Sequence, residues 1–197
     1  MPTWTQSSKT SNNASTRKAT VAECKLRVFL DANVLIRGVT LPRFLYEVLW
    51  HATKGDFVPV FSPLVLASAR LYVRELFPKH VDDLELLLAS LPCEIVSNPV
   101  PEEVVAHSGL VRDAKDIPVA LAAISAKVDY LVTTDRDFTD PDETTAELRR
   151  YLKPVRVGTF LHEMMGWTHE QLSAIEQRRS KCSGRDHLSL SILLKRP

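Results

Sequence analysis

Residues 25–38 read KLRVFLDANVLIRG, and residues 128–138 read VDYLVTTDRDF. Each stretch contains a short apolar run that leads to an acid, Asp31 in the first and Asp135 in the second. Apolar runs without alternation are typical of strands buried on both faces, as in a parallel sheet. We therefore predict strands over 25–30 and 130–133, with both acids at the carboxyl ends where sites of open α/β sheets form.

Strand and helix patterns alternate along the rest of the chain. This alternation predicts the α/β class, as a three-layer α/β/α sandwich around a mainly parallel central sheet. The acids at 140–143 are expected in a solvated loop. Further strands are expected over 57–61, 94–96 and 155–157, and helices over 41–53, 63–77, 79–91, 101–108, 117–127, from 159 onward, and over 168–179.

Composition narrows the class of protein. Hydrophobic residues make up 45% of the 197 residues and charged residues 25%, which excludes collagen-like, disordered and coiled-coil proteins for the bulk of the chain. Apolar runs fall far short of the roughly 18 residues that cross a membrane. Residues 1–24 lack the apolar centre of a signal peptide, and the three cysteines form no CxxC pair. We expect a cytoplasmic protein without a membrane partner.

Charge divides the chain into three parts. Residues 1–20 carry three bases and no acid, and residues 176–197 carry six bases against two acids, whereas the middle carries 16 bases and 22 acids. We expect a disordered basic Ser/Thr-rich tail over 1–24, a folded domain over 25–165 and a helical extension over 166–197. Apolar residues of the extension, Leu172, Ile175 and the segment 188–194, either pack on the domain or bind a partner.

Three acids are candidates for a metal site. Asp116 begins the helix that precedes the strand expected over 130–133, so its carboxylate can converge with those of Asp31 and Asp135. A carboxylate at a helix start also has a capping role, which explains Asp116 but not the other two. Oxygen ligands without nearby His or Cys suit Mg²⁺ or Mn²⁺, and such an ion suits phosphodiester hydrolysis.

Three stretches carry a resemblance to a known family: VFLDANVLIRG (28–38), DAKDIPVALAA (113–123) and DYLVTTDRDF (129–138). In this order they resemble the signatures of PIN domains, metal-dependent ribonucleases that include the VapC-like toxins of bacterial toxin–antitoxin pairs. The resemblance covers residues 26–165 and implies an α/β/α sandwich with a parallel sheet. It also implies an RNA substrate, Mg²⁺ or Mn²⁺ as cofactor, an antitoxin protein partner and pairing as a homodimer.

The resemblance assigns roles residue by residue. Asp31, Asp116 and Asp135 match the acids that bind the metal and carry the catalysis. Three supporting positions match as well: an additional metal ligand at Asp137, a residue that orients Asp31 at Asn33, and a hydroxyl that positions substrate or a water ligand at Thr134.

One departure from the family pattern concerns the helix expected over 63–77, which follows the strand over 57–61. The family usually has a Glu where this chain has Ala67 or Ser68, and the next acid, Glu75, lies on the order of 10 Å further along. Arg70, near the missing acid, could bind RNA phosphate or occupy the metal's place, although a solvated helix residue is the favoured explanation.

Two functions remain open. The first is an endoribonuclease, the toxin of a toxin–antitoxin pair. The second is a catalytically degenerate PIN-like module that binds RNA or a protein without cleavage.

Overall fold

The computed structural model describes residues 25–41 and 43–181. The tail predicted over 1–24 and the apolar segment 188–194 lie outside the described residues. Within the described part, five strands form one sheet in the order β3-β2-β1-β4-β5, and every pairing is parallel. The strands are β1 (Arg27–Leu30), β2 (Val58–Phe61), β3 (Glu94–Ile95), β4 (Tyr130–Thr133) and β5 (Pro154–Arg156).

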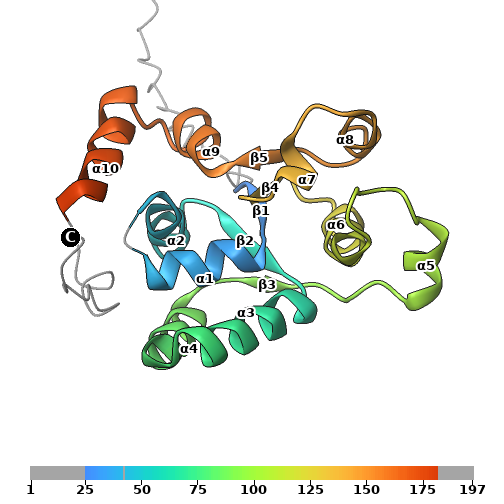
Figure 1. Ribbon diagram of the computed structural model, residues 1–197, viewed down its shortest axis with the longest axis horizontal. Helices are drawn as coiled ribbons and strands as arrows, with labels where there is room; N and C mark the ends of the chain where they lie inside the picture. Colours follow the sequence, from blue (N-terminus) through green and yellow to red (C-terminus); the bar gives the residue numbers. More distant parts are fainter. Residues whose placement is uncertain (1–24, 42, 182–197) are drawn as a thin grey trace, which may run out of the picture.

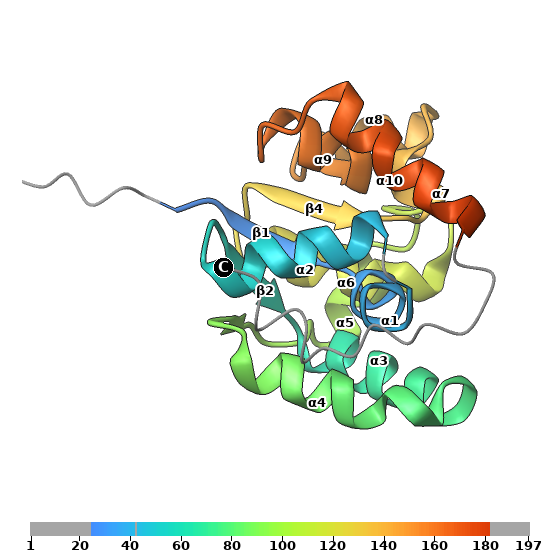
Figure 2. The same ribbon diagram turned by 90° about the vertical axis from the view of Figure 1, so that its left-hand side faces the viewer.

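Helices cover the sheet on both sides, which confirms the predicted α/β/α architecture. Figure 1 shows α1 and α2 on one side of β1 and β4, and α5 and α6 on the other. Figure 2 shows α3 and α4 at one end of the sheet, with α9 and α10 at the opposite end. The helices are α1 (Ala32–Thr40), α2 (Phe44–Lys54), α3 (Pro63–Leu76), η1 (Pro78–His80), α4 (Val81–Ser90), α5 (Pro101–Ala106), η2 (Ala114–Asp116), α6 (Ile117–Ser125), α7 (Arg136–Thr139), α8 (Glu143–Leu148), α9 (Val157–Glu163) and α10 (His169–Lys181).

Helix α1 is absent from the expected elements. Its sequence, ANVLIRGVT, is rich in β-branched residues and contains a glycine, so its intrinsic helix propensity is low. Packing compensates, because five of its nine residues are buried. At Gly38 the helix passes so close to α2 that an added Cβ would collide with the Leu49 side chain.

The expected solvated loop over 140–143 is wrong at its end. Asp142 is the N-cap of α8, and its Oδ1 accepts a hydrogen bond from the Thr145 amide at 2.7 Å. The Thr145 hydroxyl in turn accepts from the Asp142 amide at 3.0 Å. This reciprocal capping box begins helix α8. In the sequence, the acids at 140–143 favour a loop, so the helix was not predicted.

The C-terminal part of the described chain packs on the domain. Ile175 in α10 is 4% exposed, and Leu172 packs against the core. The Trp167 indole donates a hydrogen bond to His51 Nε2 of α2 at 2.9 Å. Of the two alternatives for these apolar residues, packing on the domain is therefore correct for Leu172 and Ile175. No helix among the described residues has the length and apolar character needed to cross a bilayer.

Candidate metal centre

The ends of β1 and β4 bring the first acids together. Leu30 pairs with Val132 in the sheet, and the Asp31 amide donates to the Val132 carbonyl at 3.2 Å. This register places Asp31 beside Thr133, whose hydroxyl donates to Asp31 Oδ2 at 2.9 Å. The same hydroxyl oxygen accepts from the Asp135 amide at 3.0 Å. One buried hydroxyl therefore connects the two strand ends.

Asp31 is held in a buried, polar setting. It is 8% exposed, and Asn33 Nδ2 donates to its Oδ2 at 3.3 Å. Burial raises the pKa of Asp31, and the hydrogen bonds from Thr133, the Ala32 amide and Asn33 oppose that rise. The hydroxyl that donates to Asp31 is that of Thr133. The role expected of Thr134, which is to position substrate or a water ligand, stays a prediction. The register of β1 against β4 places Thr133 beside Asp31, and the sequence alone does not give that register.

Asp116 stands at the N-cap position of α6, yet its carboxylate accepts no capping hydrogen bond from the described helix. Burial raises its pKa to about 7, with further contributions from the negative charges of Asp135, Asp31, Asp113 and Asp137. Capping therefore does not account for this acid. Its carboxyl faces a concentration of negative charge that a cation would relieve.

Asp113 is a member of the cluster that sequence reasoning missed. Its carboxylate and those of Asp116 and Asp137 each offer an oxygen, and these oxygens lie within 4.8 Å of one another. Asp113 and Asp116 are three positions apart across the turn η2, a spacing that puts side chains on the same side. The D-x-x-D spacing in the stretch 113–116 was the available signal.

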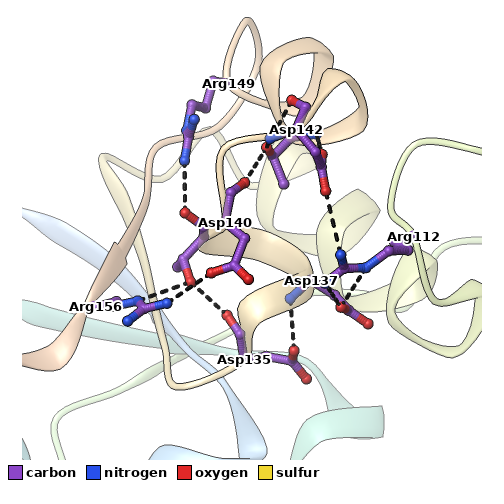
Figure 3. Close-up of polar contacts among 9 residues, drawn as sticks. Arg112, Asp135, Asp137, Asp140, Asp142, Arg149 and Arg156 are labelled. Carbon is purple, nitrogen blue, oxygen red and sulfur yellow. Dashed lines mark hydrogen bonds and ion pairs between the residues drawn. The ribbon is translucent and has the colours of Figure 1, made fainter.

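Asp135 has two roles in the fold. It follows β4 as predicted, and its Oδ1 accepts from the Asp137 amide at 2.9 Å, which makes it the side-chain cap of α7. The expectation that capping does not explain Asp135 is therefore wrong. Asp137 itself binds Arg112, whose Nε donates to Oδ1 at 2.8 Å and whose Nη2 contacts the same oxygen (Figure 3).

Further arginines border the acids in Figure 3. Arg156 donates to Asp140 Oδ1 at 2.9 Å and to the Thr139 hydroxyl at 3.2 Å. Arg149 donates to the Thr139 carbonyl at 2.9 Å. These contacts connect α7 to α8 and β5. None of the acceptors belongs to the three-acid cluster, which is formed by Asp113, Asp116 and Asp137.

Helix α3 adds no acid to the cluster within the described residues. Ala67, Ser68 and Glu75 are exposed on α3. Arg70, expected near the missing acid, forms two hydrogen bonds with Glu85 of α4, at 2.7 and 2.9 Å. This pair lowers the pKa of Glu85 and ties the two helices together. The positive charge of Arg70 is therefore already compensated by Glu85.

The donor set fits a hard divalent cation. Asp113, Asp116 and Asp137 supply carboxylate oxygens only, the ligands that Mg²⁺ and Mn²⁺ prefer. Asp31 and Asp135 act electrostatically on Asp116 from the adjoining strand ends. Like charges at this spacing destabilise one another unless a proton or a cation intervenes.

The fold is an α/β/α domain in which a parallel sheet lies between layers of helices. Its acidic site lies where β1 and β4 end and where α6 begins. The family model of the PIN domain matches residues 27–137, more than half of the chain. The chain belongs to the PIN domain family, as the three stretches of sequence predicted.

The chain is similar to two solved structures. PAE2754 from Pyrobaculum aerophilum has 18% sequence identity and a TM-score of 0.46, over 72% of this chain and 97% of that one. VapBC2 from Rickettsia felis, bound to a DNA fragment from their promoter, has 18% identity and a TM-score of 0.48, over 66% of this chain and 98% of that one. No curated protein matches the chain.

Proposed function

We propose that this protein is a metal-dependent endoribonuclease that hydrolyses RNA phosphodiester bonds in the cytoplasm with Mg²⁺ or Mn²⁺. The observation that carries the proposal is the convergence of Asp113, Asp116 and Asp137, whose carboxylate oxygens lie within 4.8 Å of one another. Burial, and then the charges of four other acids, raise the pKa of Asp116 to about 7. When bound, a divalent ion lowers the pKa of a coordinated water and stabilises negative charge on the phosphate.

Different residues of the chain would have different roles in this reaction. Asp113, Asp116 and Asp137 would hold the ion, since their oxygens lie within 4.8 Å of one another. Asp31 and Asp135 complete the negative field from the strand ends. Asp31 is oriented by Thr133 and Asn33, which both donate to its Oδ2, and burial raises its pKa.

We further propose that the protein is the toxin of a toxin–antitoxin pair, with an antitoxin and a second copy of this chain as partners. Membership of the PIN domain family supports this assignment. The outer face of α3 offers a surface for a protein partner, because its large apolar side chains are exposed. They include Leu71 at 56%, Tyr72 at 47% and Leu76 at 57%.

RNA cleavage tests the enzymatic proposal. The purified protein is incubated with single-stranded RNA in Mn²⁺, in Mg²⁺ and in EDTA, beside Asp116→Asn and the exposed control Glu163→Gln. We expect cleavage that requires metal, falls at least 100-fold in Asp116→Asn and persists in the control. A folded wild-type protein that binds no Mn²⁺ and cuts no RNA would overturn the proposal.

The second candidate is a degenerate PIN-like module that binds RNA or a protein without cutting. The observation in its favour is that α3 has Ala67 and Ser68 where an acid is usual, both exposed. Such a module would bind RNA equally in Mn²⁺ and in EDTA and yield no product in either. A metal-dependent product excludes it.

A further inference from the structure

Arg112 shares a ligand with the candidate metal centre. Its guanidinium places two N–H groups on Asp137 Oδ1, one of them at 2.8 Å, and its Nη1 lies 3.7 Å from Asp142 Oδ2. Asp137 is also one of the three acids whose oxygens converge. The guanidinium and a divalent ion would therefore compete for the same carboxylate.

This ion pair is exposed, which makes the competition reversible. The Arg112 side chain is 52% exposed and that of Asp137 is 25% exposed. Ion pairs in such settings contribute little to stability, whereas a divalent ion gains from several carboxylates at once. The ion should therefore displace Arg112 from Asp137 without large disruption of the fold.

A displaced Arg112 remains at the site. It is the residue directly before Asp113, so its backbone stays attached to the cluster. Its planar guanidinium carries donors in the geometry that matches two phosphate oxygens, which a lysine lacks. Arg156 and Arg149 differ, because their partners, Asp140 and Thr139, lie outside the three-acid cluster.

We propose that Arg112 binds the RNA phosphate at this centre, and that metal binding to Asp137 makes it available by taking the carboxylate it holds. Asp137 thus exchanges a guanidinium for a divalent ion, and the guanidinium exchanges a carboxylate for a phosphate. This inference rests on the proposed metal site, and it adds a substrate-binding residue that the sequence patterns did not single out.

Metal affinity tests the first half of the exchange. Mn²⁺ binding is measured by calorimetry on the full chain for wild type, Arg112→Gln and Arg156→Gln. Both variants remove one positive charge near the acids, but only the first frees Asp137. We expect Mn²⁺ to bind Arg112→Gln about 5–10-fold more tightly than wild type, against less than twofold for Arg156→Gln.

RNA affinity tests the second half. Fluorescence anisotropy of a labelled single-stranded RNA is recorded in Ca²⁺, used as a slow-cleaving substitute, and in EDTA. We expect Arg112→Gln to weaken RNA binding about tenfold in Ca²⁺ and less than twofold in EDTA, where Asp137 still holds Arg112 in the wild type. Arg156→Gln should lose similar affinity in both conditions.

Two outcomes would overturn the inference. One is an unchanged Mn²⁺ affinity in Arg112→Gln relative to Arg156→Gln, while the wild type binds Mn²⁺. The other is an equal loss of RNA affinity with and without Ca²⁺. A wild type that binds no Mn²⁺ at all removes the proposed metal site as well, so the two failures are distinguishable.

Discussion

Asp116 shows how a single carboxyl can be changed by its neighbours. Its pKa rises from 3.8 to about 7, first through burial and then through four nearby acids. In the unfolded chain the same carboxyl would ionise near its ordinary value. Between pH 4 and 7 the folded protein therefore retains a proton that the unfolded chain releases, and stability falls as pH rises through this window.

Asp116→Asn should therefore stabilise the metal-free protein at high pH. We expect its free energy of unfolding to exceed that of wild type by about 1–2 kcal/mol at pH 8, once solvent screening at this half-buried site is allowed for. At pH 4 the difference should vanish. Urea unfolding in EDTA measures both values, with Glu163→Gln as the control. An equal gain at both pH values would mean that ionisation of Asp116 is not the cause.

Thr133 provides a second test at the residue scale. Thr133→Val keeps the shape but removes the hydroxyl that donates to Asp31 and accepts from the Asp135 amide. We expect a loss of about 1–3 kcal/mol in the free energy of unfolding, because the Asp135 amide loses its acceptor and Asp31 loses one of its donors. Thr134→Val, the adjacent control, should lose less than about 0.5 kcal/mol. A larger loss in the control would show that the bridging hydroxyl is misassigned.

The acids that follow strands could be named from the sequence, whereas their supporting contacts could not. Asp31 and Asp135 directly follow or lie close to apolar runs, a position that a single segment reveals. The Thr133 bridge depends on the pairing of β1 with β4, segments about a hundred residues apart. Pairing of that range is a tertiary property, so the contact of the Thr133 hydroxyl with Asp31 could not be predicted from the sequence.

At the scale of elements, helix α1 illustrates how packing overrides propensity. The five strands were expected close to their observed bounds, because apolar runs between turns are local signals. Helices α1, α7 and α8 were not expected. The first is stabilised by burial against α2, and the last two by side-chain caps at Asp135 and Asp142.

The close approach of α1 to α2 predicts a strong effect at Gly38. An added Cβ would meet the Leu49 side chain and lie 3.1 Å from the Leu45 carbonyl oxygen. We expect Gly38→Ala to lower the free energy of unfolding by about 1–3 kcal/mol. Gly158→Ala in α9 meets nothing within 4 Å and should raise it by about 0.5 kcal/mol. Thermal unfolding of the two variants compares them directly, and equal shifts would contradict the close packing.

At the scale of the whole molecule, the described end of the chain behaves as part of the domain. The expected boundary after residue 165 would separate Trp167 from His51 and Ile175 from its buried position. Burial of an isoleucine contributes about 1.5–3 kcal/mol and a hydrogen bond about 1 kcal/mol. We therefore expect the segment 166–181 to contribute to the stability of the fold.

A chain ending at Met165 should unfold at a lower temperature than one ending at Lys181. We expect the midpoint to fall by about 10 °C, since each kcal/mol corresponds to roughly 2–4 °C in a chain of this size. Differential scanning calorimetry of the two truncated proteins gives the comparison. Coinciding midpoints would mean that α10 adds nothing and that 25–165 is the complete folding unit.

The bridge between Asp31 and Thr133 also has a consequence during synthesis. These residues stand 102 positions apart in the chain. A ribosome adds about 5–20 residues per second, so roughly 5–20 s pass between their appearance. For most of that interval Asp31 exists without Asp113 and Asp116, and Asp137 follows Thr133 by four residues. The two strand ends can therefore pair, and the acids of the candidate metal centre can gather, only after synthesis has passed Asp137.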